Sequence, residues 1–139
     1  PAETSGPGLA ALKGRLPMPV SGTIANRYGQ PRPEGGTTWK GLFIRADEGS
    51  PVRAVAAGQV VHADWLRGFG NLLIIDHGSD YLSVYGHNQS LVRETGDQVQ
   101  AGEVIATVGS SGGSAESGLY FELRRQGRTL DPRPWIRSR

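Results

Sequence analysis

His62, His77 and His87 are the first side chains to consider as catalysts or metal ligands in this chain of 139 residues. A zinc hydrolase needs three protein ligands and one open position, and neutral imidazole is a common ligand. No two of these histidines are spaced i, i+2 or i, i+4, so local geometry alone cannot bring two rings to one metal. We interpret them as a strand histidine, a turn histidine and a groove histidine, with a metal site rebuilt from them as the alternative.

Two glycine-rich stretches offer other chemistry. Residues 110–114 (SSGGS) lack the GxSxG elbow of a serine hydrolase, so we interpret them as a loop and not as a nucleophile or a phosphate cradle. Gly68-Phe69-Gly70 lacks the following helix that a dinucleotide site requires. The chain has no cysteine, which excludes a disulfide scaffold, a zinc finger and a thiol nucleophile.

Composition predicts one turn-rich domain. With 37% hydrophobic and 20% charged residues, the chain can bury a core, and it has no run of roughly 18–20 apolar residues that could span a membrane. Its 21 glycines and 9 prolines follow no fixed period, which favours an all-β domain over a collagen-like chain. The net charge of +2 is too small to make nucleic acid the expected partner.

Arginines crowd the C-terminal segment, at positions 124, 125, 128, 133, 137 and 139. We interpret them as a solvated basic tail. Attraction to an anionic surface, such as a cell-wall polymer or lipid headgroups, is the alternative.

The chain begins at Pro1 without an initiator methionine, so we expect a fragment whose targeting segment lies outside it. Residues 1–16 are rich in small residues and proline, and we interpret them as a linker or the end of an upstream region. Residues 17–139 form the expected domain. The segment at this boundary, residues 16–20 (LPMPV), contains two prolines and suits a sheet edge.

Short β-like runs alternate with turn signals through the rest of the chain, a pattern typical of an antiparallel sheet or barrel. The expected strands are residues 39–45, 51–56, 58–65, 71–76, 81–85, 104–108, 119–125 and 129–130. No helical periodicity persists for more than about two turns. The fold class predicted is therefore all-β.

Alternation along two of these strands predicts a groove. In residues 118–125, Leu119, Phe121 and Leu123 share one face, which we expect to be core. The opposite face carries Gly118, Tyr120, Glu122 and Arg124. In residues 81–87, Leu82 and Val84 are expected to point inward, and the outward side chains are Tyr81, Ser83, Tyr85 and His87. Two strands that present tyrosine, histidine and arginine outward suggest a shared groove.

The order of motifs resembles the LytM domain of the lysostaphin-type zinc endopeptidases, which cut peptidoglycan. Three stretches carry the resemblance, which covers roughly residues 17–135: GLFIRADEGSPVRAVAAGQVV, NLLIIDHGSDYLSVYGHNQSL and AGEVIATVGSSGGSAESGLYFELRR. The resemblance implies the LytM/lysostaphin-type peptidase-like fold, with antiparallel sheets and a central groove.

The zinc ligands of that family do not match. Trp39 and Phe43 stand where the resemblance places the first His and Asp ligands, and Gly118 and Tyr120 stand in place of the final HLH histidines. His87 alone matches a family active-site position. Tryptophan, phenylalanine and glycine side chains offer no lone pair, and a phenol with a pKa of about 10 is a poor substitute for imidazole. The resemblance therefore implies a homologue with no metal, no cofactor and no peptidase activity.

A groove that lacks the metal-ligating residues implies a surface that binds a partner. The residues expected to line it are Trp39, Lys40, Phe43, Phe69, Tyr85, His87, Tyr120 and Arg124. Strict alternation would point Lys40 away from Trp39 and Phe43, so it reaches the groove only where the strand starts irregularly. The alternative for Trp39 and Phe43 is that they fill the vacated cavity as core.

The segments WKG, ADWLRGFG, SVYGHNQS and GLYFELRRQG are similar to EnvC-type activators of cell division. This resemblance implies a non-catalytic periplasmic protein at the division septum, which activates zinc N-acetylmuramoyl-L-alanine amidases by binding a helical segment of the amidase. It also implies an upstream coiled coil that docks on the FtsEX complex. The alternatives are a passive peptidoglycan-binding module, a zinc endopeptidase with a rebuilt metal site, and an activator of the NlpD type.

Overall fold

The computed structural model of the chain describes residues 8–32 and 37–137. The strands are β1 (Thr23–Asn26), β2 (Leu42–Arg45), β3 (Pro51–Arg53), β4 (Gly58–Leu66), β5 (Gly70–Gly78), β6 (Tyr81–Leu91), β7 (Gln98–Val99), β8 (Val104–Val108), β9 (Gly118–Arg125) and β10 (Arg128–Leu130). Two 3-10 helices, η1 (Leu9–Leu12) and η2 (Arg133–Trp135), are the helical elements of the described ranges. Neither is of the length or hydropathy that a membrane-spanning helix requires. The all-β class is confirmed.

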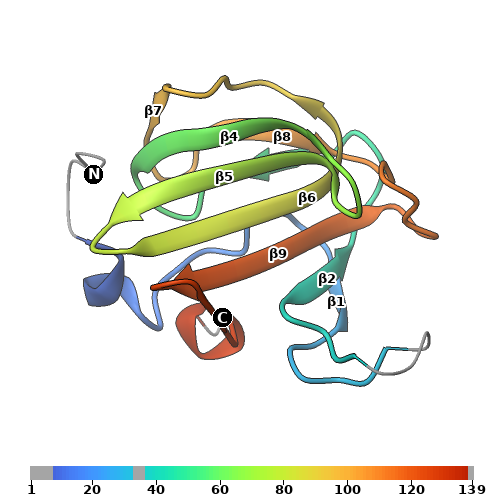
Figure 1. Cartoon of the computed structure of the whole chain (residues 1–139), viewed down its shortest axis with the longest axis horizontal. Coiled ribbons are helices and arrows are strands. Elements are labelled where there is room, and N and C mark those ends of the chain that lie inside the picture. Colours follow the sequence, from blue (N-terminus) through green and yellow to red (C-terminus); the bar gives the residue numbers. More distant parts are fainter. Residues whose placement is uncertain (1–7, 33–36, 138–139) are drawn as a thin grey trace.

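All pairings between the strands are antiparallel. The sheet runs in the order β1-β2-β9-β6-β5-β4-β7, with β10 beside the second half of β9 and β8 linking β6 to β3 (Figure 1). The long β5–β6 hairpin turns at Ser79 and Asp80, whose φ angles of 53° and 68° match the left-handed residues of a tight hairpin turn.

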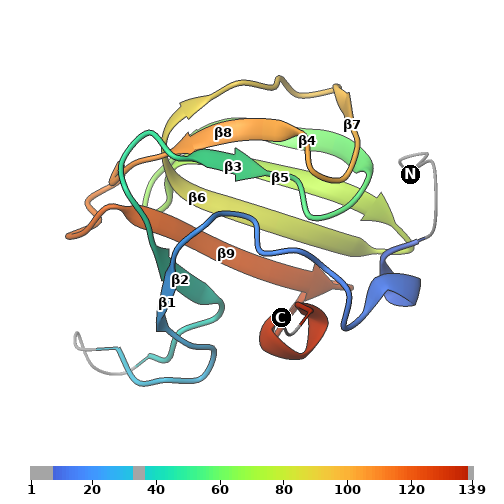
Figure 2. The ribbon, with the colours of Figure 1, turned by 180° about the vertical axis from the view of Figure 1, so that it is seen from behind.

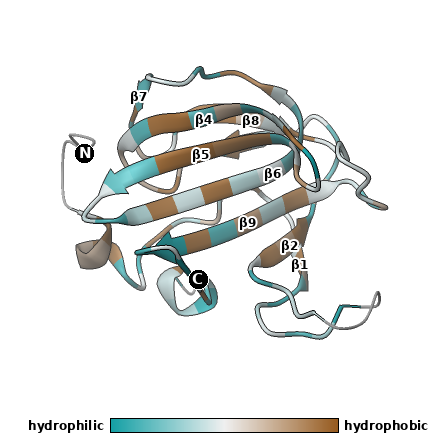
Figure 3. Cartoon of the chain, in the orientation of Figure 1, coloured by the Kyte–Doolittle hydropathy of each residue, from teal (hydrophilic) through white to brown (hydrophobic). Residues whose placement is uncertain are grey.

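The core lies between two layers. Seen from behind, β3, β8 and the extended segment before β1 lie across the long strands β5, β6 and β9 (Figure 2). A hydrophobic run lies in the middle of β5, and hydrophobic residues alternate with polar ones along β6 and β9 (Figure 3). This pattern matches strands that bury one face against the core and keep polar groups on the other.

Every run predicted as a strand contains one, with ends that differ by a few residues. The largest change is in β6, which continues to Leu91 and pairs its last residues with β8. Two strands were missed, β1 and β7. Both are short, and β7 is held by two pairs with Gly58 and Gln59, so neither carries a local alternation that sequence could show.

The predicted faces are correct for β9 and wrong for β6. Leu119, Phe121 and Leu123 are fully buried in the core, as expected. In β6, however, Tyr81 and Tyr85 belong to the core, and Tyr85 has no exposed surface. Tyr85 pairs with Phe121 across the ladder, so it must share the buried face of β9.

The first described residues are part of the domain. Leu9 and Leu16 are 2% and 1% exposed and lie in the core cluster with Trp135 of η2. Leu16 forms a parallel bridge with Ile136. Residues 9–16, expected to be part of a linker or of the end of an upstream region, therefore pack against the domain and close one end of its core. Residues 1–7 of that interpretation, and Arg139 of the basic tail, lie outside the described residues.

Candidate functional site

Two adjoining hollows lie on the polar side of β9 and share four lining residues, Arg32, Trp39, Gly68 and His87. The first, of about 350 Å³, is lined by these four together with Thr37, Thr38, Lys40, Phe69, Tyr120, Glu122 and Arg124. The second, of about 370 Å³, adds Asn26, Phe43 and residues 112–116 to the shared four. We call the two hollows together the groove.

The loop before β2 places the shared tryptophan and the neighbouring lysine. The backbone N–H of Trp39 donates to Gln30 O, and Trp39 O accepts from Gly29 N–H, so a local pair of backbone bonds fixes the main chain at Trp39. β2 begins only at Leu42, and Lys40 precedes the regular ladder. Its side chain is therefore free of the strand alternation and lines the first hollow, while remaining exposed.

The polar face of β9 forms a short ladder of side chains, Tyr120, Glu122 and Arg124. Arg124 Nε lies 2.7 Å from Glu122 Oε1, and the Tyr120 hydroxyl donates to Glu122 Oε2. Glu122 is 2% exposed, so its charge is compensated within the groove wall. Burial, and then the Glu122 charge, raise the pKa of Tyr120, which keeps its phenol a neutral donor.

Aromatic rings cover the floor of the groove. The Trp39 ring centroid lies 6.3 Å from those of Phe43 and Tyr120, and Phe69 lies 5.9 Å from Tyr120. The Arg32 guanidinium stacks over the Trp39 ring at 3.9 Å, a distance typical of a cation–π contact. The groove thus combines an aromatic floor with cationic walls.

His87 lies between the two hollows and is held by its surroundings. Its φ is 65°, and its N–H donates to Phe69 O at 2.7 Å, so the β4–β5 hairpin fixes its backbone. Nδ1 lies 2.8 Å from Ser111 O; because a carbonyl only accepts, Nδ1 carries the proton and Nε2 keeps the lone pair. Burial lowers the pKa of His87, and the nearby Arg32 charge lowers it further.

The residues of the groove do not fit a zinc ion. Phe43 is 5% exposed, and a Cβ built on Gly118 would lie 2.5 Å from its Cζ, so the ring occupies the space beside Gly118. Of the side chains at positions 39, 43, 118 and 120, only the neutral phenol of Tyr120 has an oxygen, and it donates to Glu122. His87 then supplies a single imidazole, one ligand where a zinc site needs at least three.

The alternative of a site rebuilt from three histidines is not supported either. His77 is buried in the core, with Nδ1 2.7 Å from Ala57 O and Nε2 2.7 Å from Ser83 Oγ. His62 lies on β4, outside the set of residues that line the groove. Within residues 8–32 and 37–137, no three side chains of histidine, cysteine, aspartate or glutamate converge closely enough to hold a metal.

Of the eight residues expected in the groove, Tyr85 is the exception. It packs in the core with its ring 5.4 Å from Phe121, and its hydroxyl oxygen accepts from Val55 N–H at 3.2 Å. The other seven line one or both hollows. The alternative that both rings fill the vacated cavity as core describes Phe43, which is almost fully buried, better than Trp39, which is half-buried.

Sequence reasoning missed two charged residues of the groove. Glu122 was placed on the correct face but not assigned a role, although its position between Tyr120 and Arg124 on one face was a usable signal. Arg32 lies in an irregular loop, and nothing in its local sequence indicates that it stacks on Trp39.

The sequence profile of Peptidase family M23 matches residues 37–132, which is more than half of the chain. The chain belongs to this family. The resemblance to the LytM domain is thereby confirmed.

Several curated relatives of the M23 chain carry the name of an activator. The murein hydrolase activator EnvC of Escherichia coli is 47% identical over 129 residues, which is 93% of this chain and 30% of that protein. The murein hydrolase activator NlpD of Escherichia coli is 40% identical over 122 residues, 87% of this chain and 31% of that protein. The chain thus spans about a third of the length of these relatives.

Solved structures of M23 peptidases share the fold. The catalytic domain of the antimicrobial peptidase lysostaphin from Staphylococcus simulans matches with a TM-score of 0.79 and 29% identity, over 84% of this chain and 93% of that one. A zinc-containing peptidase from Vibrio cholerae matches with a TM-score of 0.77 and 26% identity, over 84% of this chain and 38% of that one. The lysostaphin-like fold predicted from sequence is confirmed.

Proposed function

We propose that this domain is a non-catalytic activator of periplasmic zinc N-acetylmuramoyl-L-alanine amidases and that the groove is its docking site. The observation that carries the proposal is the groove itself, in which Trp39, Phe43 and Tyr120 stand at the family's ligand positions and the cations Lys40 and Arg124 lie beside them. The activator names of the EnvC and NlpD relatives support the same reading. An M23 peptidase needs a metal-bound water, and the side chains present cannot hold the metal.

The chemistry of the groove suits an amphipathic helical segment. Trp39, Phe69 and Tyr120 offer apolar surface, and aromatic residues are frequent anchors of protein interfaces. Lys40 forms no ion pair with any other residue of the described ranges, whereas Arg124 is already paired with Glu122. Apolar side chains of the partner segment would pack on the rings, and its acidic side chains would meet Lys40 and Arg124.

Release of an autoinhibited amidase is the proposed consequence of binding. The docked segment would be the one that blocks the amidase active site, and docking can open the enzyme only by the difference in affinity between its blocked and open forms. A hundredfold shift requires about 2.7 kcal/mol of that difference. The zinc chemistry belongs to the amidase.

The proposed place of action is the periplasm at the division septum, where daughter-cell peptidoglycan is split. The FtsEX contact implied by the EnvC-type resemblance involves an upstream coiled coil, and it stays a prediction about sequence outside this chain. Direct contact with peptidoglycan also stays a prediction.

A charge-reversal pair tests the groove without disturbing the core. Lys40→Glu removes the unpaired cation of the groove, and we expect at least about a tenfold loss of amidase activation, because like charges would meet at the partner's acidic residues. Arg128→Glu makes the same charge change on exposed β10, outside the groove, and should activate like the wild type. The measurement is dye release from purified sacculi by a purified zinc amidase, with melting temperatures taken for both variants.

Each alternative has its own signature in this assay. Equal activation by wild type and Lys40→Glu would contradict the proposal. Sacculus binding with no response from any amidase would indicate a passive peptidoglycan-binding module, and cleavage of sacculi together with stoichiometric zinc would indicate an endopeptidase. A response from an amidase that serves NlpD-type activators would change the partner but keep the docking site.

A further inference from the structure

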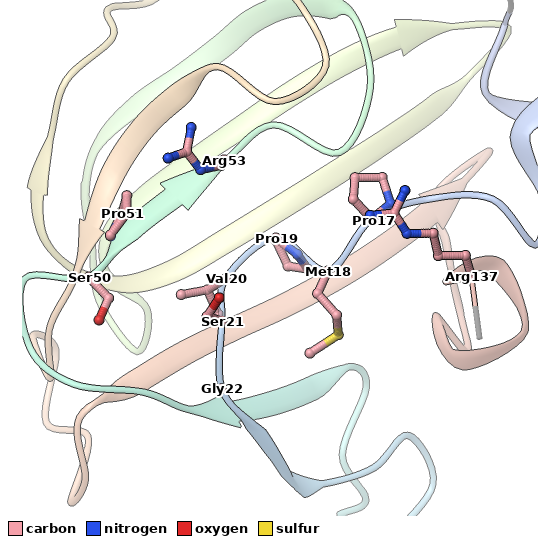
Figure 4. A pocket seen from close by; sticks show the side chains of 10 residues that line it. All are labelled: Pro17, Met18, Pro19, Val20, Ser21, Gly22, Ser50, Pro51, Arg53 and Arg137. Carbon is pink, nitrogen blue, oxygen red and sulfur yellow. The ribbon is translucent and has the colours of Figure 1, made fainter. Parts of the chain in front are cut away.

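A separate hollow of about 900 Å³ lies on the back of the domain, and it shares no lining residue with the groove. Residues 17–22 line one side, and Ser50, Pro51 and Arg53 line the other, with Arg137 completing the wall (Figure 4). Figure 2 shows the same region, where the segment before β1 passes below β3.

The hollow exists because two chain segments diverge. Arg53 N–H donates to Pro19 O at 2.8 Å and ties the segment to β3. A few residues later the segment turns to β2, where Thr23 pairs with Arg45. The space between the bond at Arg53 and the pairing at Thr23 is left open, floored by Val20, which is 3% exposed.

Backbone groups at this opening lack partners. The N–H groups of Met18, Val20 and Ser21 have no hydrogen-bond acceptor among the residues that the structure describes. β3 pairs with β8 on one side only, so the backbone of Pro51 faces the hollow and not a second strand. Because Pro51 has no N–H and the Arg53 N–H already bonds to Pro19 O, this edge offers an added extended segment only carbonyl acceptors, and the donors are left to the N–H groups of Met18, Val20 and Ser21.

The charge of the hollow selects the occupant. Arg53 and Arg137 are exposed and form no ion pair with another described residue, and no acidic side chain lines the hollow. One Arg53 nitrogen, Nη1, donates to Gly102 O at 3.0 Å, which fixes the guanidinium while its other N–H groups stay available. Carboxylates are the planar groups that such a guanidinium binds in bidentate fashion.

We propose that this hollow docks an extended acidic segment of a partner polypeptide. Apolar side chains of the segment would rest on Met18, Val20 and Pro51, and its carboxylates would pair with Arg53 and Arg137. The site is independent of the groove, so it would give the domain a second contact with a protein partner.

The test uses a short labelled peptide of alternating glutamate and valine, titrated with the whole chain by fluorescence anisotropy. We expect saturable binding that weakens at least about tenfold in the double variant Arg53→Gln/Arg137→Gln. The matched control is Arg15→Gln/Arg133→Gln, which removes the same charge from exposed residues outside the hollow and should bind like the wild type. Melting temperatures confirm that each variant is folded.

A second variant separates shape from charge. Ser21→Trp places a ring in the hollow without changing any charge, and we expect it to weaken peptide binding as much as the double variant does. Unchanged binding by Ser21→Trp, or equal weakening by the control pair, would overturn the proposal and leave only diffuse attraction to a basic surface.

Two further measurements exclude other occupants. Loss of peptide binding in Lys40→Glu alone would place the peptide in the groove and overturn the proposal, whereas unchanged binding there supports it. Sedimentation with phosphatidylglycerol vesicles that depends on Arg53 and Arg137, together with peptide binding that does not, would identify a lipid site and also overturn it. These outcomes are distinct from failure of amidase activation, which concerns the groove.

Discussion

The two faces of β9 carry side chains of different chemistry. Leu119, Phe121 and Leu123 are fully buried among apolar side chains, and they tie β9 to the core. The opposite face buries Glu122 against Tyr120 and Arg124, although apolar residues of similar volume would often hold a strand equally well. The core face is explained by stability, whereas the proposed docking of a partner would account for the groove face.

A substitution on the core face of β9 should reduce stability the most. Phe121→Ala removes a ring that has no exposed surface and lies 5.4 Å from the Tyr85 ring. We expect the free energy of unfolding to fall by about 3–5 kcal/mol, because a cavity remains. Urea denaturation measures it, and a change below about 0.5 kcal/mol would show that this face is not the core.

Tyr85→Phe tests whether the Tyr85 side chain of β6 belongs to the core or to the groove. The variant keeps the ring but leaves Val55 N–H without its acceptor and takes a partner from Ser83. We expect a loss of about 1–3 kcal/mol in the free energy of unfolding, with amidase activation unchanged while the protein is folded. Loss of amidase activation without loss of stability would indicate that Tyr85 contributes to the groove after all.

Glu122→Gln tests the polar face. The shape is kept, but Arg124 loses its charged partner and Tyr120 loses a carboxylate acceptor. We expect a loss of only about 1–2 kcal/mol in stability, since the Arg124 side chain is 36% exposed and water screens it. Activation should fall by more than this stability change explains. Equal losses in both measurements would make Glu122 a purely structural residue.

A smaller change, in the pH dependence of stability, is expected from two histidines, the buried His77 and the groove residue His87. Burial lowers the pKa of both His77 and His87, so each favours the neutral form in the folded state. The unfolded chain then binds more protons as the pH falls below about 6.5, and stability decreases in that direction. We expect the decrease between about pH 7.5 and pH 5.5 to shrink in both His77→Asn and His87→Ala, and activation to change only in His87→Ala.

The pH comparison has a clear negative result. An unchanged pH dependence of stability in both variants would show that neither imidazole is held neutral by its surroundings. His62→Ala serves as the control, since its histidine belongs neither to the core cluster nor to the groove.

Much of the architecture could be predicted from local pattern. Turn residues and alternating runs located eight of the ten strands, because those runs are long enough to show their period. The strands β1 and β7 could not be predicted, because each is held by pairing with another strand and has no pattern of its own. The packing of Leu9 and Leu16 could not be predicted for the same reason, because they share a core cluster with Trp135 near the other end of the chain.

Residue identities alone decide which atoms are available at the family's ligand positions. Trp39, Phe43 and Gly118 have no side-chain lone pair to offer a metal in any fold, so residue identities are enough to exclude them as zinc ligands. Alternation also placed Tyr120 opposite Leu119, because side chains point to opposite faces of a strand at every step.

Which phase of that alternation is buried in β6 depends on how the strand pairs in the folded sheet. Period 2 is the same whichever face is inward, and Tyr85 is inward because its cross-strand partner is Phe121. Likewise, the stacking of Arg32 on Trp39 and the hollow between β3 and residues 17–22 arise from segments that meet in space. Side-chain chemistry can be read along the chain, whereas burial depends on what each side chain meets after folding.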